Sequence, residues 1–352
     1  MTSENDESKS RSNVFEYLCV DRFLESLNHA RALATAFEMG LIDFMLQKKN
    51  ISPESLAKQW GVGLQALQLL LSLLLSNRVV KYQDGHIKLT GEFLHALEFR
   101  DLLELKLQIS TFAAHDFLDY FSDLVCRPDL FAQRSNFRRL FSYNRCFDDS
   151  KESYEATKRW MRITTTLTKY EAQACLVHHD FSRYRQILDI GGNSGEFALR
   201  ICRSCPDVRA TVFDLPLVCT IGLEHVRSEP EADRITFIRG NALDDQLPGG
   251  FDLVSFKSML HDWPDSLARR LIQNGWAALK PGGTILIFER NSFAGDLRSV
   301  PFSLLPFLLF LHSFRSPVFY AQCLENLGFE DISIQEIVLE MPFSLICARR
   351  PG

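Results

Sequence analysis

The chain has 352 residues, a formal net charge of −5, and 46% hydrophobic and 24% charged residues. This length allows two domains of about 100 to 200 residues each, and the composition is that of an ordinary globular protein. The negative net charge provides no general attraction to nucleic acid or to anionic membranes, so we expect neither as a partner.

The N-terminal residues 1–13 are polar and lack the apolar core of a signal peptide, which predicts a disordered tail and a cytoplasmic location. The most apolar later stretch, Phe302 to Leu311, contains Pro306 and is shorter than the roughly 20 residues of a membrane span. Nine scattered cysteines, including Cys202 and Cys205 in a CxxC inside a helical pattern, indicate reduced structural thiols.

The N-terminal half has the pattern of a winged helix. Residues 14–47 carry apolar side chains at helical spacing, which predicts two or three amphipathic helices. The helix-start signal Ser52-Pro53, the turn at Gly61 and the stretch Leu64 to Ser76 then predict two helices. Asp84-Gly85 lies between two short alternating segments and predicts a hairpin.

A winged helix raises the alternative of DNA binding. The second of its predicted helices reads LQALQLLLSLLLS and contains no Lys or Arg. A recognition helix needs polar and cationic groups for bases and phosphates, so this helix favours core or dimer packing.

The C-terminal half predicts a doubly wound α/β domain. After a helical layer over residues 100–180, β-type runs alternate with helical stretches, which is typical of a mainly parallel, Rossmann-like sheet with helices on both faces. The runs are 186–190, 210–213, 235–238, 253–256 and 284–288. Two further runs, 332–339 and 343–348, predict a hairpin at one edge, giving seven strands.

The first of these runs ends in the glycine-rich turn of ILDIGGNSGEFALRI. Gly191, Gly192 and Gly195 allow the backbone to pass close to a ligand, and Asn193 tolerates a positive φ. The spacing is not GxGxxG, which argues against a dinucleotide, and the bare motif is equally compatible with tight-turn packing.

The second run ends at Asp214, about 20 residues after the glycine turn, where an acid can accept hydrogen bonds from ribose hydroxyls. The alternative is a helix cap before Leu215-Pro216. Glycine turn and acid together predict a nucleoside ligand.

Five segments resemble the plant-type, caffeate- and acetylserotonin-like O-methyltransferase family: DIGGNSG, FDLP, GNAL, FKSMLHDWPD and LKPGGTILIFER. The resemblance covers nearly the whole chain. It implies the cofactor S-adenosylmethionine and a homodimer. It also implies a helical, winged-helix dimerisation and substrate-capping domain over 14–160 and a methyltransferase domain over 161–352.

The resemblance also implies site residues. Gly191 and Gly192 would pass beside the methionine part of the cofactor, Asp214 would hold its ribose, and His261 would be the catalytic base that Glu289 orients. Asn241 and Ala242 would border the adenine. The remaining cofactor-binding residues would be Asp189 and Lys257.

Methyl transfer itself requires two things. The nucleophile must be held in line with the methyl group, and a base must take its proton. His261 follows the β-run FDLVSF and, with a reference pKa of about 6.5, is mostly neutral at pH 7. Taken alone, a histidine there is more often a hydrogen-bonded loop residue. We expect Trp263 to pack and Asp265 or Ser266 to cap the next helix.

Three positions depart from the family pattern. Asn193 stands for the third glycine of GGGxG, and Asn241 for the acid after Gly240. Where the family commonly has a second glutamate beside its histidine, this chain has Phe314 or Arg315. The last departure leaves a C- or N-methyltransferase as an alternative to O-methylation. A separate alternative is a non-catalytic protein that uses the cofactor fold as a sensor or the winged helix to bind DNA.

The sequence predicts the class of substrate only broadly. The 28 phenylalanines predict an apolar pocket for a small, aromatic metabolite, with Trp160, Met161 and Phe310 as its walls. No clustered carboxylates suggest a magnesium site, so we expect a metal-independent O-methyltransferase, of the kind used in secondary metabolism.

Overall fold

The computed structural model describes residues 15–48, 51–293 and 300–352, which form two compact units. The sheet unit comprises Arg139–Gly295 and Phe310–Gly352 together with Phe15, and the helical unit comprises Glu16–Arg138 and Asp296–Leu309. The predicted tail 1–13 lies outside the described residues. The boundary expected between residues 160 and 161 falls within a helix, α10 (Lys151–His178).

Where two or three helices were predicted, the helical unit begins with a 3-10 helix, η1 (Glu16–Leu24), and two α-helices, α2 (Leu27–Glu38) and α3 (Leu41–Gln47). Then follow α4 (Pro53–Trp60), α5 (Leu64–Ser76), β1 (Val80–Gln83) and β2 (His86–Leu89). Ser52 caps α4 as predicted, by accepting a hydrogen bond from the backbone N–H of Ser55 at 3.2 Å. The hairpin turn has positive φ at both Asp84 and Gly85, as a tight two-residue turn requires.

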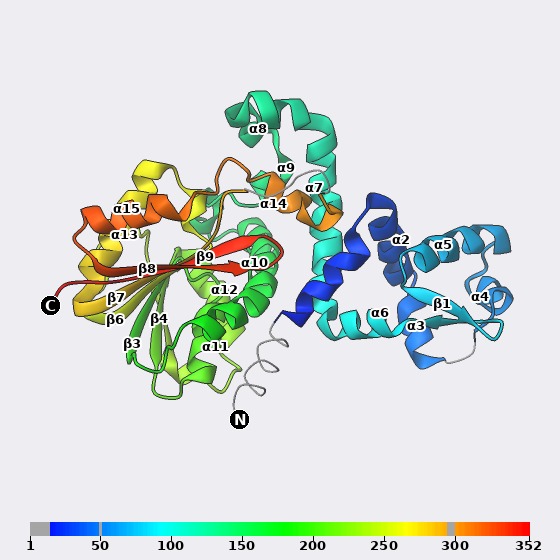
Figure 1. Ribbon diagram of the computed structural model, residues 1–352, viewed down its shortest axis with the longest axis horizontal. Coiled ribbons are helices and arrows are strands. Elements are labelled where there is room, and N and C mark those ends of the chain that lie inside the picture. Colours follow the sequence, from blue (N-terminus) through cyan, green and yellow to red (C-terminus); the bar gives the residue numbers. More distant parts are fainter. Residues whose placement is uncertain (1–14, 49–50, 294–299) are drawn as a thin grey trace, which may run out of the picture. The chain divides into compact units, whose positions relative to one another are not determined.

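The rest of the helical unit is built around a long helix, α7 (Arg100–Cys126). The neighbouring elements are α6 (Gly91–Ala96), η2 (Leu97–Phe99), α8 (Pro128–Arg134) and α9 (Asn136–Arg139). Late segments of the chain, η6 (Phe302–Leu304) and α14 (Leu305–Leu308), pack against α7 (Figure 1). The backbone N–H of Phe302 donates to the Glu25 carbonyl at 3.3 Å, so this unit is assembled from both ends of the chain.

Among the described helices none is by itself long and apolar enough to cross a membrane. Only α4 and α5 taken together have the length and apolar composition of a membrane span among the described helices, and the two are bent by 118° relative to each other.

The sheet unit contains the seven predicted strands, in the order β5-β4-β3-β6-β7-β9-β8. They are β3 (Gln186–Ile190), β4 (Arg209–Asp214), β5 (Ile235–Arg239), β6 (Phe251–Lys257), β7 (Leu279–Arg290), β8 (Glu330–Val338) and β9 (Pro342–Arg349). The first five are parallel, and β9 runs antiparallel to both β7 and β8. The predicted parallel sheet and its edge hairpin are therefore confirmed.

Helices cover both faces of this sheet, which explains why its central strands are continuous apolar runs. One group packs on β6 to β9, namely α13 (Asp265–Ala278) and α15 (Pro317–Asn326). The other packs on β4 and β5, namely α11 (Glu196–Ser204) and α12 (Pro216–Val226), with α10 outside them (Figure 1). Short turns, η3 (Asn144–Phe147), η4 (Ala232–Arg234) and η5 (Leu260–Asp262), complete the unit.

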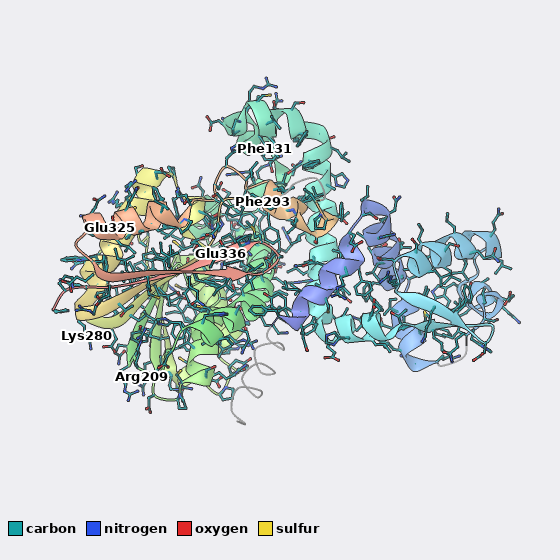
Figure 2. The ribbon with its side chains drawn as sticks, in the orientation of Figure 1. Phe131, Arg209, Lys280, Phe293, Glu325 and Glu336 are labelled. Carbon is teal, nitrogen blue, oxygen red and sulfur yellow. The ribbon has the colours of Figure 1, made fainter. Side chains whose placement is uncertain are left out.

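The strand order reverses direction between β3 and β6. Ligand crevices of open parallel sheets form at such a switch point, outside the carboxyl ends of the strands. Arg209, the first residue of β4, and Lys280, the second residue of β7, are labelled in Figure 2 and lie at the opposite, amino edge. The predicted site residues that follow β3, β4, β6 and β7 therefore share one edge of the sheet.

Candidate active site

The glycine turn connects β3 to α11. Gly191, Asn193 and Gly195 have φ values of 67°, 54° and 77°, so the expected positive φ at Asn193 is confirmed. A Cβ atom on Gly191 would lie 2.8 Å from Met259 Cε, and one on Gly192 would lie 2.5 Å from Asp189 Oδ2. The positive φ of Gly191 favours glycine there, because the Met259 methyl is the flexible end of a side chain and can move, whereas at Gly192 the buried Asp189 carboxylate leaves no room for a Cβ atom.

Asp214, at the end of β4, has its carboxylate fixed by backbone donors. Its Oδ2 accepts a hydrogen bond from Asn193 N at 2.8 Å, and its Oδ1 accepts one from Leu215 N at 2.7 Å. Burial raises the pKa of this carboxyl to about 6, against the lowering effect of those two donors. The acid next to the glycine turn is thus ionised at neutral pH and held in one orientation.

Asp189, the penultimate residue of β3, is buried, and only one of its two carboxylate oxygens has a hydrogen-bond partner among the described residues. Its Oδ1 accepts from Ser255 Oγ at 2.7 Å, while its Oδ2 is buried and has no hydrogen-bond partner among the described residues. Burial raises the pKa of this carboxyl to about 7. An unpartnered buried acceptor beside a glycine turn suits an incoming hydrogen-bond donor.

The loop after β5 contains Asn241 and Ala242. Asn241 is engaged within its own loop: its Nδ2 donates to Asp244 Oδ2 at 2.6 Å and its Oδ1 accepts from Leu243 N at 3.1 Å. The Ala242 carbonyl accepts from Asn274 Nδ2 at 2.7 Å. These contacts fix the loop and leave the second lone pair of the Asn241 oxygen for a ligand.

Lys257, the last residue of β6, faces α10. Its ammonium donates to Thr168 Oγ1 at 2.9 Å and forms a buried ion pair with Glu171. Glu171 also pairs with Arg290 at the end of β7. The predicted cofactor lysine is therefore part of a buried ionic cluster that ties α10 to two strands.

His261 lies in η5, at the carboxyl end of β6, and contacts Glu289 of β7. Its Nδ1 is 2.8 Å from Glu289 Oε2. The other oxygen of Glu289 accepts from Met259 N at 2.7 Å and Leu260 N at 2.6 Å. Glu289 is completely buried, so one carboxylate both orients the imidazole and shapes the loop that carries it.

On its other side the imidazole meets a second acid. His261 Nε2 is 3.4 Å from Asp262 Oδ1, and the Tyr143 hydroxyl hydrogen-bonds to Asp262 Oδ2. Burial alone lowers the pKa of His261, but the carboxylates of Asp262 and Glu289 outweigh it, so the pKa is raised above 6.5.

The two residues at the place of the missing glutamate have different positions. The Phe314 ring lies 5.2 Å from the His261 ring. Arg315 instead holds the loop from outside, donating to the Leu260 carbonyl at 2.9 Å and to the Trp263 carbonyl. An aromatic ring therefore lies against the histidine at this place.

Asp265 pairs with Arg315 at 2.7 Å. The expectation that Asp265 or Ser266 caps α13 is wrong, because Pro264 occupies the cap position and no side chain caps this helix.

The predicted pocket walls Trp160, Met161 and Phe310 are all buried. Trp160 and Met161 belong to one apolar cluster with residues of α12. Phe141 connects this cluster to Phe310, with ring centroids 6.4 Å from Trp160 and 4.9 Å from Phe310. The indole N–H of Trp160 is buried and has no hydrogen-bond acceptor among the described residues.

Sequence reasoning missed Tyr143, which stacks on Trp263 with a centroid distance of 5.6 Å, and the acidic contact of Asp262 with His261. It also missed Thr164 and Thr165 of α10, which hydrogen-bond to the glycine turn. Asp262 was accessible as a second acid within the LHDW segment, whereas the other three give no local signal.

Comparison with known proteins decides the family. Residues 127–330 match the sequence profile of the O-methyltransferase domain. The chain belongs to this family and is an O-methyltransferase. S-adenosylmethionine is the methyl donor of the family.

Several characterised relatives cover most of the chain. The 3-hydroxy-5-methyl-1-naphthoate 3-O-methyltransferase of Streptomyces sahachiroi is 27% identical over 74% of this chain and 73% of its own length. The 3-amino-4-hydroxybenzoate 4-O-methyltransferase of Streptomyces cremeus is 28% identical over 91% of this chain and 87% of its own. The structure of human N-acetylserotonin methyltransferase with S-adenosylmethionine has a TM-score of 0.70 at 21% identity, covering 92% and 94% of the two chains.

The two carboxylates around His261 make its pKa a measurable property of the site. We predict that NMR titration of the wild-type protein, with the His261 signal assigned through His261→Asn, gives a pKa above 6.5. Glu289→Gln and Asp262→Asn should each lower that pKa, because each removes a negative charge beside the ring. Asp244→Asn, an exposed change in another loop, serves as the control. An unchanged His261 pKa in both test variants would contradict the prediction.

Proposed function

We propose that this enzyme transfers a methyl group from S-adenosylmethionine to a hydroxyl of a small aromatic metabolite, with His261 as general base. The observation that carries the proposal is the His261–Glu289 pair. It lies at the carboxyl ends of β6 and β7, the same edge of the sheet as the glycine turn and Asp214.

The cofactor, when bound, supplies a methyl group on a sulfonium. Gly191 and Gly192 would pass beside its methionine part, and the unpartnered Oδ2 of Asp189 suits its ammonium group. The fixed carboxylate of Asp214 would accept from both ribose hydroxyls. These residues therefore fit the group.

Two further contacts complete the proposed cofactor site. Asn241 and Ala242 would border the adenine, the former through the remaining lone pair of its amide oxygen. Lys257 would act on the cofactor through α10, because its ammonium is already engaged by Glu171 and Thr168.

The catalytic step needs a base with the correct tautomer. Glu289 accepts the Nδ1 proton of His261, which leaves Nε2 as the proton acceptor. Nε2 would take the proton of the substrate hydroxyl. The cofactor would supply the methyl group, its carbon–sulfur bond breaking as the carbon–oxygen bond forms and leaving S-adenosylhomocysteine as the neutral thioether. Asp262, 3.4 Å from Nε2, stabilises the imidazolium that results.

The substrate proposed is a hydroxyaromatic compound that also carries an oxygen acceptor. Trp160, Met161 and Phe310 supply apolar walls, and the buried indole N–H of Trp160 offers a donor with no acceptor among the described residues. Relatives named for a hydroxynaphthoate and an aminohydroxybenzoate support this class.

We also propose that the helical unit is a winged-helix dimerisation domain. The C-terminal part of α7, after the non-helical backbone at Tyr120, supports this, because Phe121 and Val125 are four residues apart on one helical face and are 49% and 58% exposed. Apolar side chains gathered on one exposed face are typical of an interface.

Cofactor affinity should depend on the charge of Asp214. We predict that calorimetric titration with S-adenosylhomocysteine gives roughly tenfold weaker binding at pH 5 than at pH 7.5. The reason is that a carboxyl with a pKa of about 6 is ionised at the higher pH and mostly protonated at the lower, where one oxygen becomes a donor and no longer accepts as a carboxylate does. Asp214→Ala should abolish micromolar binding.

Asp189 also titrates near neutral pH, so a second variant separates the two carboxyls. In Asp189→Asn the affinity for S-adenosylhomocysteine should still fall as the pH is lowered through about 6. In Asp214→Asn this fall should be absent. Tight binding by Asp214→Ala would overturn the ribose assignment.

The base is tested by activity. We predict that His261→Ala lowers kcat by at least about 100-fold toward a hydroxynaphthoate or hydroxybenzoate found by a screen with labelled methyl donor. Glu289→Gln should also lower kcat, because its amide favours the wrong histidine tautomer. His115→Asn, at an exposed position, is the control. Full activity of His261→Ala at pH 7 would end the general-base role.

The oligomeric state is tested by light scattering coupled to size-exclusion chromatography. We expect the wild type to have the mass of a dimer and Phe121→Glu with Val125→Glu to have that of a monomer, because two charges would be buried in the contact. Glu substitutions at the exposed Val318 and Val338 of the sheet unit are the control. A monomeric wild type would refute the dimer.

A further inference from the structure

One face of α10 holds the loops at the carboxyl edge of the sheet. Thr164, Thr168 and Glu171 are spaced by four and three residues, so they lie on the same side of the helix. Thr168 and Glu171 contact Lys257 at the end of β6, and Thr164 contacts Asn193 of the glycine turn. The proposed substrate wall Trp160 lies one helical turn before Thr164 on the same side.

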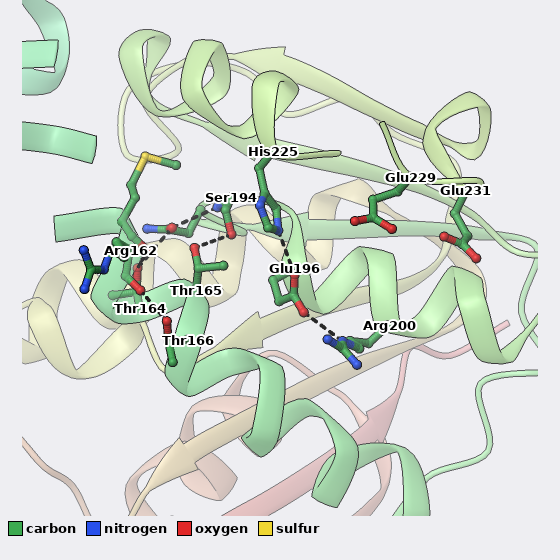
Figure 3. Close-up of polar contacts among 12 residues, drawn as sticks. Arg162, Thr164, Thr165, Thr166, Ser194, Glu196, Arg200, His225, Glu229 and Glu231 are labelled. Carbon is green, nitrogen blue, oxygen red and sulfur yellow. Dashed lines mark hydrogen bonds and ion pairs between the residues drawn. The ribbon is translucent and has the colours of Figure 1, made fainter. Parts of the chain in front are cut away.

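The contact with the glycine turn is made by hydroxyl groups. Thr164 Oγ1 shares its one proton between Asn193 Oδ1 at 3.1 Å and the Met161 carbonyl of its own helix at 3.0 Å. Thr165 Oγ1 donates to Ser194 Oγ at 2.8 Å (Figure 3). The next threonine, Thr166, donates only to the Arg162 carbonyl of its own helix, at 2.9 Å. Two successive hydroxyls therefore hold the turn, and a third of the same chemistry does not.

Asn193 is the position where the family pattern has a glycine. Its φ of 54° lies in the left-handed region, which an asparagine adopts at a cost that glycine avoids. The side chain compensates by local bonding, because Oδ1 accepts from Ser194 N at 2.8 Å as well as from Thr164. An asparagine thus gives the turn a side-chain link to α10 that glycine cannot provide.

The same residue orients the acid of the proposed ribose site. Asn193 N donates to Asp214 Oδ2 at 2.8 Å, so the peptide plane that Thr164 restrains through the side chain also holds the carboxylate. A rotation of this peptide would change the direction of the Asp214 oxygens. The chain of contacts runs from Thr164 through Asn193 to Asp214 without a gap.

We propose that Thr164 and Asn193 form a positioning pair that sets cofactor affinity by fixing the orientation of Asp214. The proposal rests on the cofactor role of Asp214 given above. Neither residue needs to touch the cofactor. The pair replaces the conformational freedom of the family's third glycine by a restraint from a helix that also carries the substrate wall.

The pair is tested by a double-mutant cycle read out as S-adenosylhomocysteine affinity by calorimetry. Thr164→Val should weaken binding about fivefold, the range expected for loss of one neutral hydrogen bond. Thr164→Ser keeps the hydroxyl and should bind within twofold of the wild type. Thr166→Val is the matched control and should leave affinity unchanged. In an Asn193→Gly background, Thr164→Val should have no further effect, because its partner is gone.

Steady-state kinetics provide an independent readout. The positioning role predicts a higher KM for S-adenosylmethionine in Thr164→Val with kcat nearly unchanged, because the group that takes the proton is unaffected. Thermal melts identify a general loss of stability, which would lower both the melting temperature and kcat.

The outcomes separate this inference from the proposed function. If Asp214→Ala abolishes binding while Thr164→Val binds as the wild type, only the positioning pair is wrong. If Thr164→Val lowers S-adenosylhomocysteine affinity equally in the wild-type and Asn193→Gly backgrounds, the positioning pair is also wrong, since the effect would not pass through Asn193. If Asp214→Ala binds normally, the ribose site fails, and the pair fails with it.

Discussion

The hydrogen bonds of the Glu289 carboxylate hold together the carboxyl edge of the sheet, where the candidate site lies. A fully buried charge is costly unless hydrogen bonds compensate for its desolvation, and Glu289 receives three of them, from Met259 N, Leu260 N and His261 Nδ1. Those donors belong to consecutive residues, so the acid determines the path of the backbone as well as the direction of the imidazole. Strand β7 thereby positions a group that follows its neighbour β6, and two parallel strands act as one rigid support.

A second buried acid gives α10 a comparable place in the structure. Glu171 lies between Lys257 and Arg290, each on a different strand, and all three side chains are shielded from water. Such an ion pair contributes little net stability compared with apolar packing, but removing one member leaves an uncompensated charge. The arrangement therefore favours one register of the helix against the sheet. The contacts of Thr164 and Thr165 with the glycine turn depend on that register.

Sequence reasoning recovered what local pattern determines. Strands β3 to β7 could be predicted because parallel strands buried on both faces are short apolar runs. The position of Asp214 beside the glycine turn could be predicted because it ends the second of these runs. The proximity of His261 to Glu289 followed only from the family resemblance. Tyr143 and Asp262 are 119 residues apart, and no periodicity links them. The packing of α14 against α7 could not be predicted either, since the segment LLPFLLFL has the composition of any apolar core segment and does not indicate its partner.

That association affects how the protein is made. Residues 302–308 complete the helical unit but are synthesised after all of the parallel strands. Vectorial synthesis normally allows an N-terminal unit to fold before the next one emerges. In this chain the apolar surface of α7 that receives η6 and α14 must wait, exposed, for most of translation. The nascent helical unit is thus a natural client for chaperones that bind exposed apolar surface.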